Sequence, residues 1–176
     1  MADQSVEPLW ARLWASRFQP NTPRLRFELG GEQFGNETPV PRFLQAHQRA
    51  STVADALFGE GCVAIVASSG WIPESDGLTE RALDGFAALQ ETGFIAPQRN
   101  EWRAPLYPDP EGEEDAWALR SYDLGCGKVL RDTLLWHAVA SEMPICPSAP
   151  ILTFLMDAER SLMLHVYDDR GMDVIA

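Results

Sequence analysis

The densest group of side chains that could do chemistry lies in the last ten residues, YDDRGMDVIA, where Tyr167 precedes Asp168, Asp169, Arg170 and Gly171. One aspartate in such a run can accept backbone N–H groups as an Asx-turn, and the arginine can bind a carboxylate through two hydrogen bonds. The glycine can adopt a positive φ. The run therefore predicts a polar turn in which the aspartates and the arginine pair with each other.

The same residues also admit a catalytic interpretation. Carboxylates, a histidine and an arginine are the groups of an acid-based or metal-assisted active site, so an enzyme with a site around His165, Asp168, Asp169 and Arg170 is an alternative. The ligand set is incomplete for a metal site, and the chain contains no zinc, calcium or phosphate-loop spacing. The sequence predicts neither a metal nor a cofactor.

A second group of candidate residues is an acidic segment, YPDPEGEED, between two alternating segments. The alternation predicts a long hairpin with these acids at its tip. Such a run repels itself unless it is solvated or faces a basic partner, and we keep both alternatives open. The predicted partner-binding residues are Asp109, Glu111, Glu113, Glu114 and Asp115.

Cys62, Cys126 and Cys146 are an odd number of cysteines without close pairing, which is typical of reduced thiols. A thiol nucleophile needs a base beside it. Cys126 is the best placed because it precedes a helix, but its flanking glycines are equally typical of a turn. His47 and His137 lie on or near apolar helix faces, where core histidines are common. We therefore predict no catalytic residue.

Helices and strands must position these groups. Apolar residues at helical spacing predict helices over 6–18, 42–58, 79–92 and 128–141. Alternation or short apolar runs predict strands over 25–29, 62–67, 101–107, 116–123, 151–156 and 162–167. The run from Cys62 to Ala67 is a strand buried on both faces, and Ser68-Ser69-Gly70 after it predicts a turn rather than a nucleophile.

The order of these elements predicts an α+β fold, with helices packed on a mostly antiparallel or mixed sheet. We expect a C-terminal hairpin that ends in the YDDRG turn. The length of 176 residues and the 45% of hydrophobic residues predict one domain over residues 1–176. The reduced thiols, and the lack of a signal segment or a long apolar run, predict a cytoplasmic protein.

The net charge of −12 is unevenly distributed. Residues 1–58 hold as many bases as acids, so the whole negative surplus falls in residues 59–176. Such a surface repels phosphate backbones and anionic membranes, and it attracts a basic partner at long range. The charge therefore predicts no nucleic-acid partner and no membrane partner, although acidity also serves solubility alone.

The segment LRFELG at 25–30, taken with YDDRGMDVIA at the end, resembles a bacterial family known only as a domain of unknown function. The hallmark of that family is the tyrosine, the paired aspartates, the arginine and the glycine. Its members also carry an arginine in the second helix ahead of an apolar segment, which Arg49 and Leu57-Phe58 match here. The resemblance spans nearly the whole chain, and the acidic segment has no counterpart in it.

Some members of that family look like immunity proteins, which are small cytosolic partners encoded beside secreted antibacterial toxins. The resemblance therefore implies a protein that binds and neutralises a cognate toxin, and the acidity of this chain predicts a basic face on that toxin. The enzyme described above is one alternative. A regulatory module that binds some other protein is another.

Overall fold

The computed structural model describes residues 6–69, 71–72, 77–78, 80–107 and 116–176. Its helices are α1 (Val6–Ser16), α2 (Pro39–Phe58), α3 (Glu80–Glu91) and α4 (Lys128–Ala140). The strands of the main sheet are β1 (Arg24–Glu28), β2 (Cys62–Ser69), β5 (Gln98–Pro105), β6 (Ala116–Gly125), β7 (Leu152–Asp157), β8 (Leu162–Val166) and β9 (Gly171–Ile175). Two short strands, β3 (Trp71–Ile72) and β4 (Gly77–Leu78), form a separate pair.

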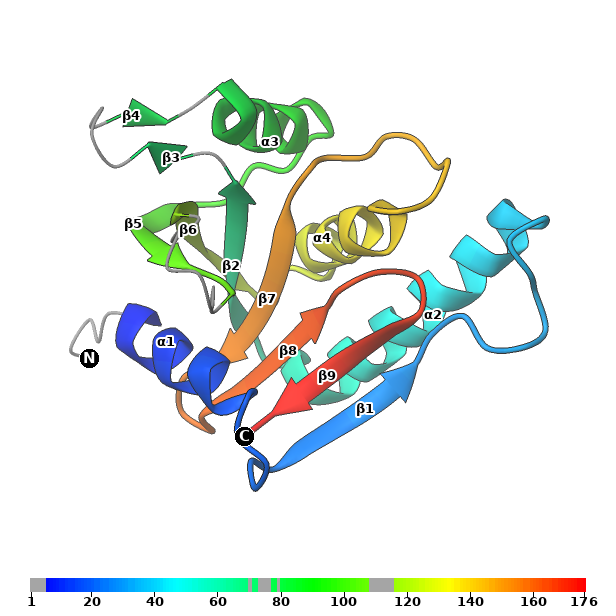
Figure 1. Cartoon of the computed structure of the whole chain (residues 1–176), viewed down its shortest axis with the longest axis horizontal. Coiled ribbons are helices and arrows are strands. Elements are labelled where there is room, and N and C mark those ends of the chain that lie inside the picture. Colours follow the sequence, from blue (N-terminus) through cyan, green and yellow to red (C-terminus); the bar gives the residue numbers. More distant parts are fainter. Residues whose placement is uncertain (1–5, 70, 73–76, 79, 108–115) are drawn as a thin grey trace.

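The main sheet has seven strands in the order β1-β9-β8-β7-β2-β6-β5, and every neighbouring pair is antiparallel (Figure 1). The predicted α+β fold is confirmed, and so are the predicted hairpins β5–β6 and β7–β8. The β2 strand lies inside the sheet between β6 and β7, as its unbroken apolar run predicts. The open edges of the sheet are β1 and β5.

Helices cover the two faces of the sheet unequally. On one face α1 buries Val6, Trp10, Leu13 and Trp14, and Trp14 packs edge-on against Phe154 of β7. On the other face α2, α3 and α4 share a larger core with the sheet, and α2 and α4 also contact each other (Figure 1). The sheet therefore separates two hydrophobic clusters.

The spacing of apolar residues explains which face of α2 is buried. Phe43, Ala46, Ala50, Ala54 and Phe58 recur every three or four residues, and all five are buried. The three alanines lie between the two phenylalanines on this face and belong to the larger hydrophobic core. The helix begins at 39 rather than at the predicted 42, because proline is tolerated in a first helical turn.

Two predictions about strands need correction. Ser68 and Ser69 belong to β2, where they pair with Ala118 and Trp117 of β6, so they do not form the predicted turn. The β9 strand was not predicted at all, because Asp173 interrupts its short apolar run. Within the described part of the chain, no helix combines the length and the apolar character that crossing a membrane requires.

Candidate functional site

The turn from β8 to β9 is formed by Tyr167 to Arg170 of the YDDRG motif. Val166 and Met172 pair across it, and the Tyr167 N–H donates to the Gly171 carbonyl at 3.3 Å. The motif therefore closes a third hairpin, which the sequence did not predict, and it joins the last strand to the sheet.

Asp168 is neutralised within this turn. Its Oδ1 accepts the Arg170 backbone N–H at 2.7 Å, which is an Asx-type hydrogen bond, and its Oδ2 accepts Arg170 Nε at 2.7 Å. The Asp168 side chain is 3% exposed, whereas that of Arg170 is 65% exposed and also reaches Glu142 at 3.1 Å. Arg170 therefore screens a buried carboxylate from solvent.

Asp169 is bound by a different arginine. Its carboxylate accepts Nε of Arg42 from the first turn of α2, and both side chains are largely buried. Arg42 also donates from Nη1 to the Phe34 carbonyl at 3.0 Å. A Cβ on Gly30 would lie 2.6 Å from Arg42 Nη2, so the glycine leaves room for the guanidinium. No local sequence signal identified Arg42, because 127 residues separate it from Asp169.

The predicted positive φ of Gly171 is wrong, because the described glycines with positive φ are Gly31, Gly61, Gly93 and Gly125. The reason for glycine is a close approach instead. A Cβ at this position would meet the Tyr167 ring at 2.9 Å from Cζ and the Phe27 carbonyl oxygen at 3.1 Å. Any larger residue would push the tyrosine ring off the hairpin.

The segment LRFELG lies directly against the YDDRG turn. Residues 24–28 pair with β9, and the Leu29 N–H donates to the Arg170 carbonyl at 2.9 Å. Arg49 of α2 donates from Nη1 to the Leu29 carbonyl, also at 2.9 Å. We call this set the motif clamp, and it joins β1, α2 and the β8–β9 turn through Leu29, Arg42, Arg49, Asp168, Asp169 and Arg170.

His165 is buried away from these arginines, under α1. Its ring stacks on Phe154 with the centroids 4.5 Å apart and meets Trp14 edge-on at 5.2 Å. Nδ1 donates to the Thr153 carbonyl at 3.0 Å, and Nε2 has no hydrogen-bond partner among the described residues. Burial lowers the pKa of His165 to about 4, so the imidazole is neutral at physiological pH.

The alternative prediction of an enzyme places His165, Asp168, Asp169 and Arg170 in one site. No hydrogen bond in the described part of the chain joins His165 to Asp168, Asp169 or Arg170. Over the described ranges, no three side chains of histidine, cysteine, aspartate or glutamate gather as a set that could hold a metal ion.

A polar cavity of about 340 Å³ opens beside the motif clamp. Both of its arginines are engaged, Arg42 with Asp169 and Arg170 with Asp168 and Glu142. An anion entering the cavity would have to displace one of these carboxylates. The lining residues are Asn36, Pro39, Arg42, Glu142, Met143, Pro144, Asp169 and Arg170.

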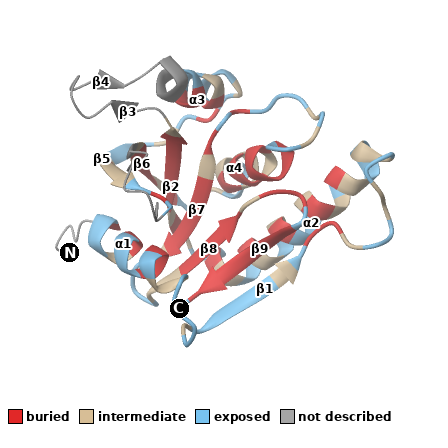
Figure 2. Cartoon of the chain, viewed as in Figure 1, coloured by how far each residue is buried: buried red, intermediate tan, exposed pale blue. Residues whose placement is uncertain are grey.

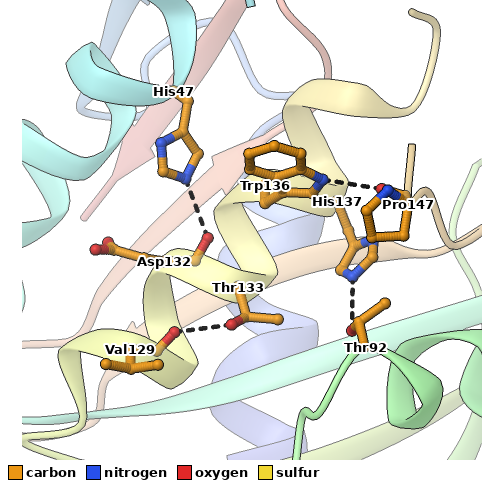
Figure 3. A pocket seen from close by; sticks show the side chains of 8 residues that line it. All are labelled: His47, Thr92, Val129, Asp132, Thr133, Trp136, His137 and Pro147. Atoms are coloured by element: carbon orange, nitrogen blue, oxygen red, sulfur yellow. Dashed lines mark hydrogen bonds between the residues drawn. The ribbon is translucent and has the colours of Figure 1, made fainter. Parts of the chain in front are cut away.

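A larger and more apolar cavity of about 410 Å³ lies between α2, α4 and the end of α3 (Figure 3). His137 is fully buried there, and its Nδ1 accepts the Ala149 N–H at 3.1 Å, so its Nε2 carries the proton and donates to Thr92 at 3.0 Å. Burial lowers the pKa of His137. His47 donates from Nε2 to the Asp132 carbonyl at 3.1 Å. His137 is therefore a hydrogen-bonded core histidine, as predicted, whereas His47 is half-buried and joins α2 to α4.

The three cysteines are free thiols. Cys62 is buried, and burial raises its pKa to about 11, so it stays protonated and unreactive. Cys126 is exposed, and its Sγ lies 3.2 Å from the Glu60 carbonyl oxygen, with which it hydrogen bonds. Cys146 is exposed near the end of α4. No described histidine hydrogen bonds to any of the three.

The predicted partner-binding acids lie outside the described residues, since 108–115 are not among them. Their flanking strands are described, and β5 and β6 pair from Gln98 and Tyr122 to Pro105 and Ala116. The segment that carries Asp109, Glu111, Glu113, Glu114 and Asp115 therefore connects two neighbouring strands at the edge of the sheet.

Comparison with known proteins gives one match. The family described as "Domain of unknown function (DUF3885)" matches residues 3–176, which is nearly the whole chain. A search of curated proteins and a search of solved structures found no match. The chain therefore belongs to the DUF3885 family of domains of unknown function.

Proposed function

We propose that this protein is a cytoplasmic immunity protein, which binds a cognate secreted bacterial toxin and neutralises it through its acidic surface. The observation that carries the proposal is the segregation of charge. The net charge of −12 falls entirely within residues 59–176, and five of those acids stand within residues 109–115. Such a field increases the rate of encounter with a basic partner.

The motif clamp supports a binding protein over an enzyme. Its charged side chains are used within the fold, because Asp168 pairs with Arg170 and Asp169 pairs with Arg42. Catalytic carboxylates and arginines need unsatisfied capacity directed at a substrate. Among the charged side chains of the motif, Arg170 is the one that a substrate could reach from solvent, and Glu142 already contacts it.

Several exposed acids of the described chain also have no ion pair within it. Glu60 follows α2, Asp84 and Glu91 lie on α3, and Glu159 lies in the β7–β8 turn. These carboxylates belong to the same acidic portion of the chain, and they extend the field that would steer a basic partner beyond residues 109–115.

Co-expression tests the proposal directly. Each toxin candidate encoded next to this gene is expressed with and without the protein, and survival and co-purification are scored. Rescue by direct binding to one toxin supports the proposal. If no neighbouring toxin is bound or neutralised, the proposal is wrong.

Charge reversal tests the role of the acidic segment. Glu111→Lys, Glu113→Lys and Glu114→Lys together should lower the association rate at least about tenfold at low salt and flatten its salt dependence. The matched control reverses three exposed acids from the neutral part of the chain, Glu7, Glu32 and Glu37. Equal losses in both variants would mean that only total charge matters and that residues 109–115 are not the contact surface.

A further inference from the structure

The edge strand β1 has an outer side that no described element covers. Its five residues are exposed except for the half-buried Phe27, and Leu25 is 64% exposed although it is a large apolar residue (Figure 2). An edge strand offers unpaired backbone groups to any strand of suitable sequence. The question is which strand this edge fits.

The hydrogen-bond register identifies the free backbone groups. The Leu29 N–H donates to the Arg170 carbonyl, and the Ala176 N–H donates to the Pro23 carbonyl, so the odd-numbered residues direct their backbone groups toward β9. By alternation, Arg24, Arg26 and Glu28 direct theirs outward. No described residue hydrogen bonds to those outward N–H and C=O groups.

We propose that this edge pairs with the same edge of a second copy of the chain, so that β1 and its symmetry mate join two sheets into one continuous antiparallel sheet. The sequence Arg-Leu-Arg-Phe-Glu is complementary to itself when it is read antiparallel about Arg26. Arg24 then lies opposite Glu28 of the second copy, and Leu25 lies opposite Phe27. The arrangement is a closed two-fold interface, and it does not depend on the proposed function.

The backbone register agrees with this alignment. The residues brought opposite each other, 24 with 28, 26 with 26 and 28 with 24, are the ones whose backbone groups point outward. In an antiparallel ladder each such pair exchanges both of its N–H···O bonds. A shift by one residue would instead oppose groups that are already bonded to β9.

The side-chain charges agree as well. Asp173 is fully buried and is shared by two arginines, with Arg26 Nε at 3.0 Å and Arg24 Nη1 at the longer distance of 3.8 Å. Arg24 can therefore bind a second anion, and Glu28 is exposed without an ion pair in the described chain. In the dimer, Arg24 of each copy pairs with Glu28 of the other copy. The two Arg26 side chains on the axis each stay neutralised by their own Asp173.

An apolar recess borders the same edge. A cavity of about 320 Å³ lies between β1 and α2, with Phe27, Met172 and Val53 in its lining. Leu25 of the second copy would lie opposite Phe27 on this face of the sheet, next to the recess. Burial of the exposed Leu25 supplies the apolar contribution that an edge pairing otherwise lacks.

Sedimentation equilibrium of the full chain tests the proposal. The mass should rise with concentration toward twice the 19.6 kDa of one chain. Arg24→Glu and Glu28→Arg each place like charges opposite one another and should weaken dimerisation at least about tenfold. The double variant, and an equimolar mixture of the two single variants, should both dimerise again, because each restores opposite charges.

The rescue separates a lost interface from a lost fold, and amide exchange gives a second measurement. The amides of Arg24, Arg26 and Glu28 should become protected as concentration rises, whereas those of Leu25 and Phe27 are protected throughout. A protein that stays monomeric at every concentration, or a dimer that neither charge change weakens, would overturn the proposal.

Discussion

Three aspartates at the C-terminal end of the chain are buried, and each is bound by an arginine. Asp168 is held by its near neighbour Arg170, but Asp169 and Asp173 are held by arginines from the first third of the sequence. A buried carboxylate without a partner is strongly unfavourable. The last ten residues therefore contain three buried anions, and two of them take their cations from other elements.

His165 makes stability depend on pH. An unfolded histidine titrates near pH 6.5, whereas His165 in the fold has a pKa of about 4. Below about pH 6.5 the unfolded state binds a proton that the folded state rejects, so acidification should lower the free energy of unfolding by up to roughly 3 kcal/mol as the pH approaches 4. The lowered pKa of His137 acts in the same direction.

Urea unfolding between about pH 7.5 and pH 4.5 measures this loss. His165→Phe keeps an aromatic ring against Phe154 and should remove most of the slope. Met156→Ala, a buried change in the same hydrophobic cluster, should lower stability equally at every pH. An unchanged slope in His165→Phe would show that other groups cause the acid sensitivity.

At the scale of elements, the motif clamp fixes the start of α2 against the β8–β9 turn. Arg42→Met leaves Asp169 buried without its cation and should cost about 3 kcal/mol of unfolding free energy. Arg99→Met is the control, because Arg99 and its partner Asp123 are 43% and 40% exposed, so the change leaves no buried charge. That change should cost less than about 1 kcal/mol. Chemical denaturation measures both, and equal losses would contradict this account of the clamp.

Helices and strands whose apolar residues recur at a regular spacing could be predicted from the sequence. Strands that depend on contacts with other strands could not. The apolar run from Cys62 predicts that β2 lies inside the sheet, and apolar residues at helical spacing predict α4. The β9 strand has no such spacing, because Asp173 interrupts its apolar residues. This aspartate can be buried in the sheet because the arginines of β1 pair with it. The exposure of Leu25 also depends on β1 being an edge, which no local pattern reveals.

The candidate site was predictable to a similar extent. The Asx-type bond of Asp168 is local, so the sequence contains all of it. The pairing of Asp169 with Arg42 and the close approach of Gly171 to Phe27 join residues far apart in the chain. A single sequence gives the residue types for such contacts but not the partners.

At the scale of the whole molecule, the net charge of −12 should oppose the compact state. Added sodium chloride screens this repulsion, so the Tm should rise by several degrees between about 10 mM and 300 mM salt. Replacing Glu7, Glu32 and Glu37 by glutamine removes three exposed negative charges and should reduce the rise. Differential scanning calorimetry measures it, and a Tm that falls with salt would mean that ion pairs dominate.

The place of β9 between β1 and β8 sets an order of events during synthesis. The β1 strand is synthesised well before β9, its partner in the main sheet, which ends at residue 175. Until β9 is made, Leu25 and Phe27 have no neighbouring strand to pair with, and Arg24 and Arg26 lack their ion-pair partner Asp173. The nascent chain must carry an unpaired β1 while the residues between β1 and β9 are synthesised, so a ribosome that stalls before β9 releases a product that chaperones and proteases can recognise.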